Sequence, residues 1–245
     1  MKTLPKLTQP EYDVTLPVTK KKIKIRPFLA KEEKILLMAV ESIEKDSSVV
    51  KNSLVQIIQN CVITKGINVN DLPAVDVEKI FIELRKRSVS ETIDLNFDLR
   101  IIFDCSNDKC PETKKVSVRL DDIKIEKFDE TANIVKIDAT KGIKLKYPSM
   151  NSIPTTGNTK TEMLFDTITN IIEIIYDGDE IYNVTDEVKK EDLREWVENL
   201  PHEILQKIVA FLTTQPQHVT DIKIVCPICG KEKIHESKGL NDFFI

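Results

Sequence analysis

The sequence predicts an α+β fold, because two different hydrophobic periods alternate along its 245 residues. Apolar residues recur every three or four positions in roughly 31–87 and 159–212, as in amphipathic helices. They alternate with polar residues in 12–25, 93–120 and 219–234, as in strands joined by turns. We therefore expect an N-terminal β-hairpin with a helical cluster, a central antiparallel sheet, and a C-terminal helical lobe. That lobe is expected to return to a cysteine-tipped, zinc-ribbon-like hairpin.

The N-terminal region is predicted to form a hairpin followed by three helices. Alternating residues flank a turn at 17–21, and Pro27 ends the second strand. The helices are expected over 31–43, from Ser47 or Ser48 onward, and over about 75–87. Cys61 lies on the apolar stripe of the second helix, which favours a buried and unreactive thiol.

The clearest strand signal runs from Ile93 to Phe103, where apolar residues alternate with polar ones. This long strand is expected to enter a turn at 105–111 and to return through residues 116–120. Further short strands of the same sheet are predicted at 123–125, 134–137 and 143–147.

The second half begins at a proline- and glycine-containing stretch, 148–157, which is the best candidate for a hinge. Thr159-Lys160-Thr161-Glu162 fits a capping box, and the helix after it is expected to reach Ile175. Further helices are predicted from about Asp186 and from Pro201. The chain is thus divided into four regions, which are 1–90, 91–150, 151–215 and 216–245.

Charge and composition exclude several classes of function. A net charge of −4 and a pI near 5.6 argue against duplex nucleic acid as a partner. There is no apolar run of about 20 residues and no signal-peptide core, so we expect no membrane partner and residence in the compartment of synthesis. Charge is uneven: residues 1–26 carry 7 basic and 2 acidic residues, and 160–205 carry 4 basic and 13 acidic residues. Each stretch is either a solvated surface or a contact for an oppositely charged protein.

Four of the five cysteines form two pairs on predicted turns between strands. In a reducing compartment, paired cysteines favour metal ligation over disulfides. We predict one structural Zn²⁺ held by Cys105, Cys110, Cys226 and Cys229, with four reduced thiols as the alternative. Four sulfur ligands leave no open position for water, so such a metal would be structural and not catalytic.

No catalytic constellation is recognisable. His202-Glu203 begins like a zinc-protease helix, but Gln206 stands where the second histidine is required. The six glycines form no phosphate-binding loop, and no G-x-S-x-G occurs. We therefore expect a protein that is not an enzyme.

Several motifs together resemble one family. They are Leu7-Thr8-Gln9-Pro10-Glu11-Tyr12, then Leu16-Pro17, Lys22 to Leu37 with its Arg26-Pro27-Phe28-Leu29 centre, Lys144-Leu145-Lys146-Tyr147-Pro148-Ser149, and Gly239-Leu240-Asn241-Asp242-Phe243-Phe244. In this order they look like the T4-like bacteriophage baseplate hub family. The resemblance spans nearly the whole chain, and it supplies no catalytic residues and no metal ligands.

The resemblance implies a non-enzymatic tail protein that helps to build the central hub of the baseplate, as a hub component or an assembly chaperone. Its partners would be other baseplate or tail proteins, namely hub, tape-measure or tail-tube components. It would act in the host cytoplasm during assembly and belong to the tail baseplate of the virion if it is retained. The resemblance leaves oligomerisation open.

Candidate contact residues are Arg26, Phe28, Lys31 to Lys34, and Phe243-Phe244, with internal packing as the other interpretation. The alternative function is a zinc-ribbon nucleic-acid-binding protein. Lys223, Lys231 and Lys233 beside the second cysteine pair favour it, whereas the acidic residues around the first pair do not.

Overall fold

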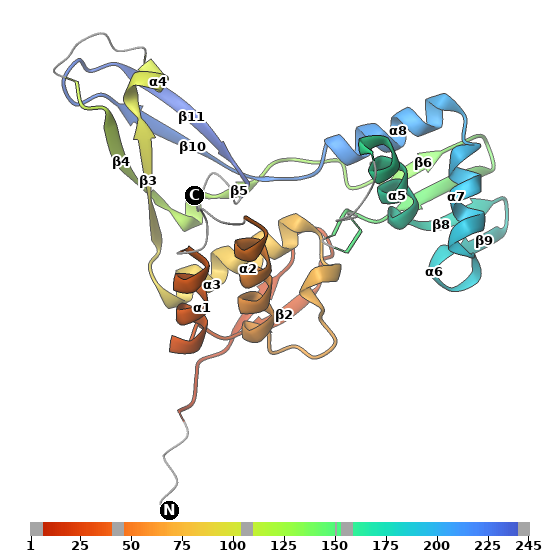
Figure 1. The fold of residues 1–245 in the computed structure, drawn as a ribbon, viewed down its shortest axis with the longest axis horizontal. Helices are drawn as coiled ribbons and strands as arrows, with labels where there is room; N and C mark the ends of the chain where they lie inside the picture. The colour runs from red at the N-terminus through yellow and green to blue at the C-terminus, as the bar shows by residue number, and fades with distance from the viewer. Residues whose placement is uncertain (1–6, 41–46, 104–109, 150, 153–158, 240–245) are drawn as a thin grey trace, which may run out of the picture. The chain divides into compact units, whose positions relative to one another are not determined.

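The computed structural model describes residues 7–40, 47–103, 110–149, 151–152 and 159–239 (Figure 1). The chain folds into two compact units. Unit 1 comprises Met1–Val69, Val75–Glu126 and Gln217–Ile245, and unit 2 comprises Asn70–Ala74 and Lys127–Pro216. Helices and antiparallel sheets occur in both, so the predicted α+β class is confirmed. Residues 217–239 thus belong to the same unit as most of the N-terminal half of the chain.

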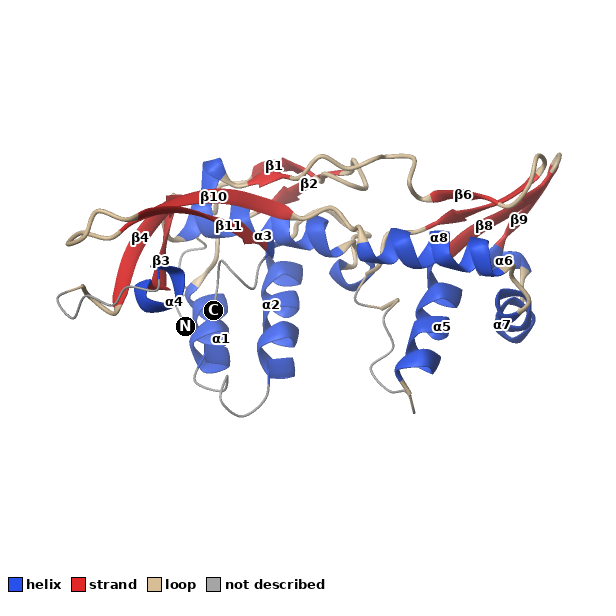
Figure 2. Ribbon diagram, turned by 90° about the horizontal axis from the view of Figure 1, so that it is seen from above, coloured by secondary structure: helices blue, strands red, loops and turns tan. Residues whose placement is uncertain are grey.

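Unit 1 begins with the predicted hairpin and helices. Strands β1 (Tyr12–Thr15) and β2 (Lys22–Ile25) pair antiparallel, and helices α1 (Ala30–Val40), α2 (Ser47–Cys61) and α3 (Ala74–Ser88) follow. In both views α1 and α2 lie side by side (Figures 1 and 2). The alternating residues Val14, Ile23 and Ile25 are buried, and a bridge from Ile25 to Val62 ties β2 to the end of α2. A short 3₁₀ turn, η1 (Val69–Asp71), precedes α3.

The rest of unit 1 consists of two hairpins that share a core. Strand β3 (Thr92–Asp98) pairs with β4 (Thr113–Arg119), and β10 (His218–Val225) pairs with β11 (Glu232–Lys238). The 3₁₀ turn η2 (Leu120–Asp122) leads to β5 (Lys124–Ile125), which pairs with the other edge of β10. Their common core contains Ile93, Leu95, Phe97, Leu99, Val118, Leu120, Ile222 and Ile224, together with Cys110 and Cys226.

Two predictions for the middle of the chain are wrong. The strand predicted up to Phe103 ends at Asp98, and helix α4 (Leu99–Phe103) follows. The Asp98 carboxylate accepts the backbone N–H groups of Arg100 (2.8 Å) and Ile101 (3.1 Å), which is the geometry of a helix N-cap. The short strands after residue 120 do not extend the β3–β4 sheet either, since β5 pairs with β10 and the others lie in unit 2.

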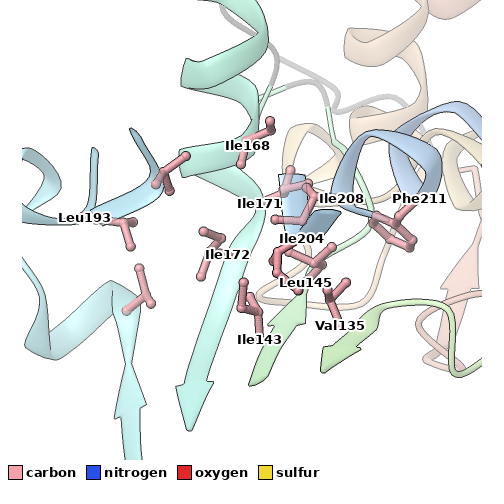
Figure 3. Close-up of a cluster of buried hydrophobic side chains, with 12 residues drawn as sticks. Val135, Ile143, Leu145, Ile168, Ile171, Ile172, Leu193, Ile204, Ile208 and Phe211 are labelled. Atoms are coloured by element: carbon pink, nitrogen blue, oxygen red, sulfur yellow. The ribbon is translucent and has the colours of Figure 1, made fainter. Parts of the chain in front are cut away.

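Unit 2 contains a four-stranded antiparallel sheet with helices packed against it. The strands, in spatial order, are β6 (Ile134–Lys136), β7 (Lys141–Leu145), β8 (Ile172–Asp177) and β9 (Glu180–Asn183). The helices are α5 (Lys160–Ile171), α6 (Val184–Glu187), α7 (Lys190–Glu198) and α8 (His202–Thr213). Figure 2 shows α5, α7 and α8 on one side of the sheet. Figure 3 shows Ile143, Leu145 and Ile172 of the sheet meeting Ile168, Ile204 and Ile208 of the helices.

The helix predicted to follow Thr159 is present, but it is shorter than predicted. Its capping box is present: Thr159 Oγ1 accepts the Glu162 N–H (3.1 Å), and the Glu162 carboxylate accepts the Thr159 N–H (3.0 Å). The helix ends at Ile171, however, and 172–177 form β8. Ile174 and Ile175 are β-branched and pair with Lys144 and Ile143 of β7, a strand that lies about 30 residues earlier in the sequence. No helix among the described residues is long and apolar enough to cross a membrane.

Candidate metal centre

The second cysteine pair lies on the tight turn between β10 and β11. Cys226 donates its backbone N–H to the Lys231 carbonyl (2.9 Å), and its own carbonyl accepts the Gly230 N–H (3.1 Å). Gly230 has φ +71°, a left-handed conformation that glycine adopts without steric cost. The turn therefore holds Cys226 and Cys229 on one side of a closed loop.

The structure brings Cys110 to this turn from the other hairpin. The Sγ atoms of Cys110, Cys226 and Cys229 all lie within 4.8 Å of one another. Cys110 and Cys226 are buried, whereas Cys229 is exposed. Three of the four predicted ligands are thus together, and Cys105 lies outside the described residues.

The backbone of the turn is polarised toward the Cys226 sulfur. Hydrogen bonds from the backbone N–H groups of Cys229 and Ile228 lower the pKa of Cys226 to about 7, against the opposing effect of burial. The thiolate is the form of cysteine that binds metals, so these N–H groups favour the ligating state. A tight turn that contains Pro227 and Gly230 is expected to aim backbone N–H groups at its sulfur atoms, and those of Ile228 and Cys229 do so at Cys226.

The donor set fits a thiophilic ion. Tetrahedral coordination with Zn–S distances of about 2.3 Å places sulfur atoms about 3.8 Å apart, and the three sulfurs lie within 4.8 Å of one another. Three cysteines are therefore close enough to hold a metal ion. A closed set of sulfurs with no solvent ligand would stabilise the fold and would not activate water.

A lysine also joins the two hairpins beside the cysteines. Lys114 of β4 donates its Nζ to the Val225 carbonyl at 2.5 Å, just before the turn that carries Cys226. Phe97 and His235 add an edge-on ring contact, with centroids 5.2 Å apart. Sequence reasoning missed Lys114, because a lysine in an alternating strand reads as a solvent-facing residue.

Three of the predicted contact residues, Arg26, Phe28 and Glu32, serve internal packing. Arg26 forms an ion pair with Glu32 (3.1 Å), whose side chain is 0% exposed. The Phe28 ring lies 6.3 Å from that of Phe81, while Lys31 and Lys34 are exposed. Phe243 and Phe244 lie outside the described residues.

The predicted core thiol is also confirmed. Cys61 is 0% exposed, and burial raises its pKa to about 11. Its thiol is therefore protonated at neutral pH and is not a nucleophile.

Comparison with known protein families identifies the chain. A family model described as T4 bacteriophage base plate protein matches residues 9–245, which is nearly the whole chain. No curated protein and no solved structure matches it. A match to this family implies interaction with other proteins of the phage baseplate. The chain therefore belongs to the family of T4 bacteriophage base plate proteins.

Proposed function

We propose that this baseplate protein helps to build the central hub, as a hub component or as an assembly chaperone, and that it acts through protein–protein contacts without catalysis. The match of the T4 bacteriophage base plate family to residues 9–245 carries this proposal. The opening motif, from Leu7 to Leu37, supports the hub assignment by its resemblance to hub proteins.

A phage in which this gene is disrupted tests the proposal. We expect infected cells to accumulate tail precursors without complete baseplates, and complementation from a plasmid to restore them. Electron microscopy of the lysates and mass spectrometry of purified particles provide the readout. Presence of the protein in mature virions would identify a hub component, and its presence only in assembly intermediates would identify a chaperone. Normal baseplates in the disrupted phage would refute the hub role.

We also propose that Cys105, Cys110, Cys226 and Cys229 hold one structural Zn²⁺. The ion would link the β10–β11 turn to the segment before β4. Cys110 in that segment and Cys226 in the turn are 116 residues apart in the sequence. Because the unfolded chain does not hold these cysteines together, the free energy of metal binding would contribute to the free energy of folding. The three-cysteine cluster supports this proposal.

Zinc content provides the test. Protein prepared without chelator should contain about one zinc per chain, and Cys226→Ser or Cys229→Ser should reduce this below about half an equivalent. Cys61→Ala is the matched control, because it removes a thiol that lies outside the cluster. Less than about half an equivalent in the native protein would contradict zinc ligation.

The alternative, a zinc-ribbon nucleic-acid-binding protein, receives less support from the hairpin. Lys223 pairs with Glu232 at 2.7 Å, and Lys233 donates to the Ile102 carbonyl at 3.3 Å. Cations that already have partners contribute less to phosphate binding. Tight, salt-dependent retardation of DNA or RNA in a gel at physiological ionic strength would favour the alternative.

A further inference from the structure

A groove in unit 2 lies between the β7–β9 part of the sheet and helix α7. Its volume is about 390 Å³, within the range of about 300–1,000 Å³ that is usual for binding pockets. The apolar side chains of Ile137, Ile175, Val188 and Leu193 line it. All of its lining residues belong to unit 2, so the groove is complete within one compact body.

Aromatic residues form another part of the lining. Tyr182 is 41% exposed on β9, and Trp196 is half-buried on α7. Tryptophan and tyrosine are among the residue types that most often carry binding energy at protein interfaces. The hydroxyl of Tyr182 already bonds to Glu180 at 2.5 Å, which leaves its ring as the contact surface.

The polar groups of the groove favour a cationic ligand. Lys141, a cation of the lining, pairs with Asp177 at 3.4 Å. Asp192 also lines the groove, is exposed, and forms no ion pair with a described residue. The adjoining β8–β9 turn, Asp177–Glu180, has three acidic residues and no basic one. The lining itself contains two carboxylates, Asp177 and Asp192, and one cation, Lys141.

The net charge of unit 2 also favours a cationic partner. Its segments, 70–74 and 127–216, contain 17 acidic and 10 basic residues, a net charge of −7, against −4 for the entire chain. A negative field of this kind attracts cationic partners and sets their orientation.

We propose that this groove docks an apolar side chain from a basic segment of another protein. The apolar anchor would be a large aliphatic or aromatic residue, and the flanking lysines or arginines would face Asp192 and the β8–β9 turn. This inference deepens the proposed function, since the segment would belong to a baseplate partner.

Peptide selection on the full-length protein tests the proposal. A random dodecapeptide display library is selected on immobilised protein, and enriched peptides are then synthesised. We expect them to share one large apolar residue with lysine or arginine on either side. Trp196 is the only tryptophan of the chain, so its fluorescence reports binding at the groove directly.

Two pairs of variants separate the groove from the general charge of the unit. Asp192→Lys and Tyr182→Ser should each weaken binding about tenfold. Glu191→Lys makes the same charge change one residue away, and Ile181→Ser alters a residue of β9 that is 61% exposed and does not line the groove. Both controls should change the dissociation constant less than about threefold. Circular dichroism checks that each variant is folded.

The proposal is overturned if no peptide is enriched, or if the enriched peptides are acidic or lack an apolar anchor. Equal weakening by Asp192→Lys and Glu191→Lys would also overturn it, because the effect would then be general electrostatics. The hub proposal stands or falls separately, on the baseplates of the gene-disrupted phage.

Discussion

Arg26→Ala should be the most damaging single substitution at the junction of β2 with the helices. The guanidinium donates to both Glu32 oxygens, at 3.2 and 3.1 Å. It also donates to the Asn60 carbonyl at 2.8 Å and to the Pro27 carbonyl at 3.0 Å. One side chain thus connects the end of β2, the start of α1 and the last turn of α2.

The expected loss is about 2–4 kcal/mol of unfolding free energy. Removing one partner of a buried ion pair costs about 3–5 kcal/mol, because the remaining charge stays buried. Glu32 is 0% exposed, so that condition holds here. The loss is expected at the lower part of the range because the Leu29 N–H (2.9 Å) and the Lys31 ammonium (3.5 Å) still stabilise the carboxylate.

Urea unfolding followed by far-UV circular dichroism provides the measurement. Lys31→Ala is the matched control: its ammonium contacts the same carboxylate but is 65% exposed, so the loss should stay below about 1 kcal/mol. The double variant Arg26→Met/Glu32→Leu should be more stable than Arg26→Ala, since it leaves no unpaired buried charge. The reasoning is refuted if Arg26→Ala costs less than about 1 kcal/mol, or if the double variant is the less stable one.

Three further predictions concern pH, packing and thiol reactivity. Burial raises the pKa of Glu32, but hydrogen bonds from Arg26 and the Leu29 N–H outweigh it and leave the pKa below the ordinary value of 4.5. The ionised carboxylate therefore stabilises the fold above pH 4.5, and this contribution disappears as the pH falls through the lowered pKa. The difference in unfolding free energy between the native protein and Glu32→Gln should consequently be smaller in acid than at neutral pH. A Cβ on Gly142 would lie 2.1 Å from the Tyr176 hydroxyl, so Gly142→Ala should cost about 1–3 kcal/mol, and a double-mutant cycle with Tyr176→Ala should recover part of it. Cys61 should resist iodoacetamide in the native protein and react in urea, as mass spectrometry of tryptic peptides can show.

Local patterns were sufficient for much of the fold. The β1–β2 hairpin and the capping box at Thr159 follow from neighbouring residues alone. Alternation of apolar and polar residues determines which face of a strand is buried, and a capping box satisfies its own donors within four residues. The spacing of the paired cysteines on predicted turns also singled out Cys110, Cys226 and Cys229, whose sulfur atoms lie close together.

Long-range contacts determined the rest. The run from Ile172 to Ile175 continues the apolar stripe of a helix, yet it forms β8 because β7 offers a strand partner. The strand predicted to reach Phe103 ends at Asp98 for a local reason instead, because the Asp98 carboxylate accepts the N–H groups of Arg100 and Ile101 and so caps helix α4.

The amino-acid pattern alone established the fold class and the β1–β2, β3–β4 and β10–β11 hairpins, and it singled out the paired cysteines as candidate ligands. Folding in three dimensions decided which strands share a sheet, and it placed Cys110 beside Cys226 across 116 residues. It also turned Arg26 inward, to a carboxylate that no solvent reaches. The physical reason is that hydrophobic periodicity reports only which face of its own helix or strand a residue occupies. Strand pairing and ion pairing depend instead on which segments, distant in the sequence, bury their apolar and charged side chains against one another.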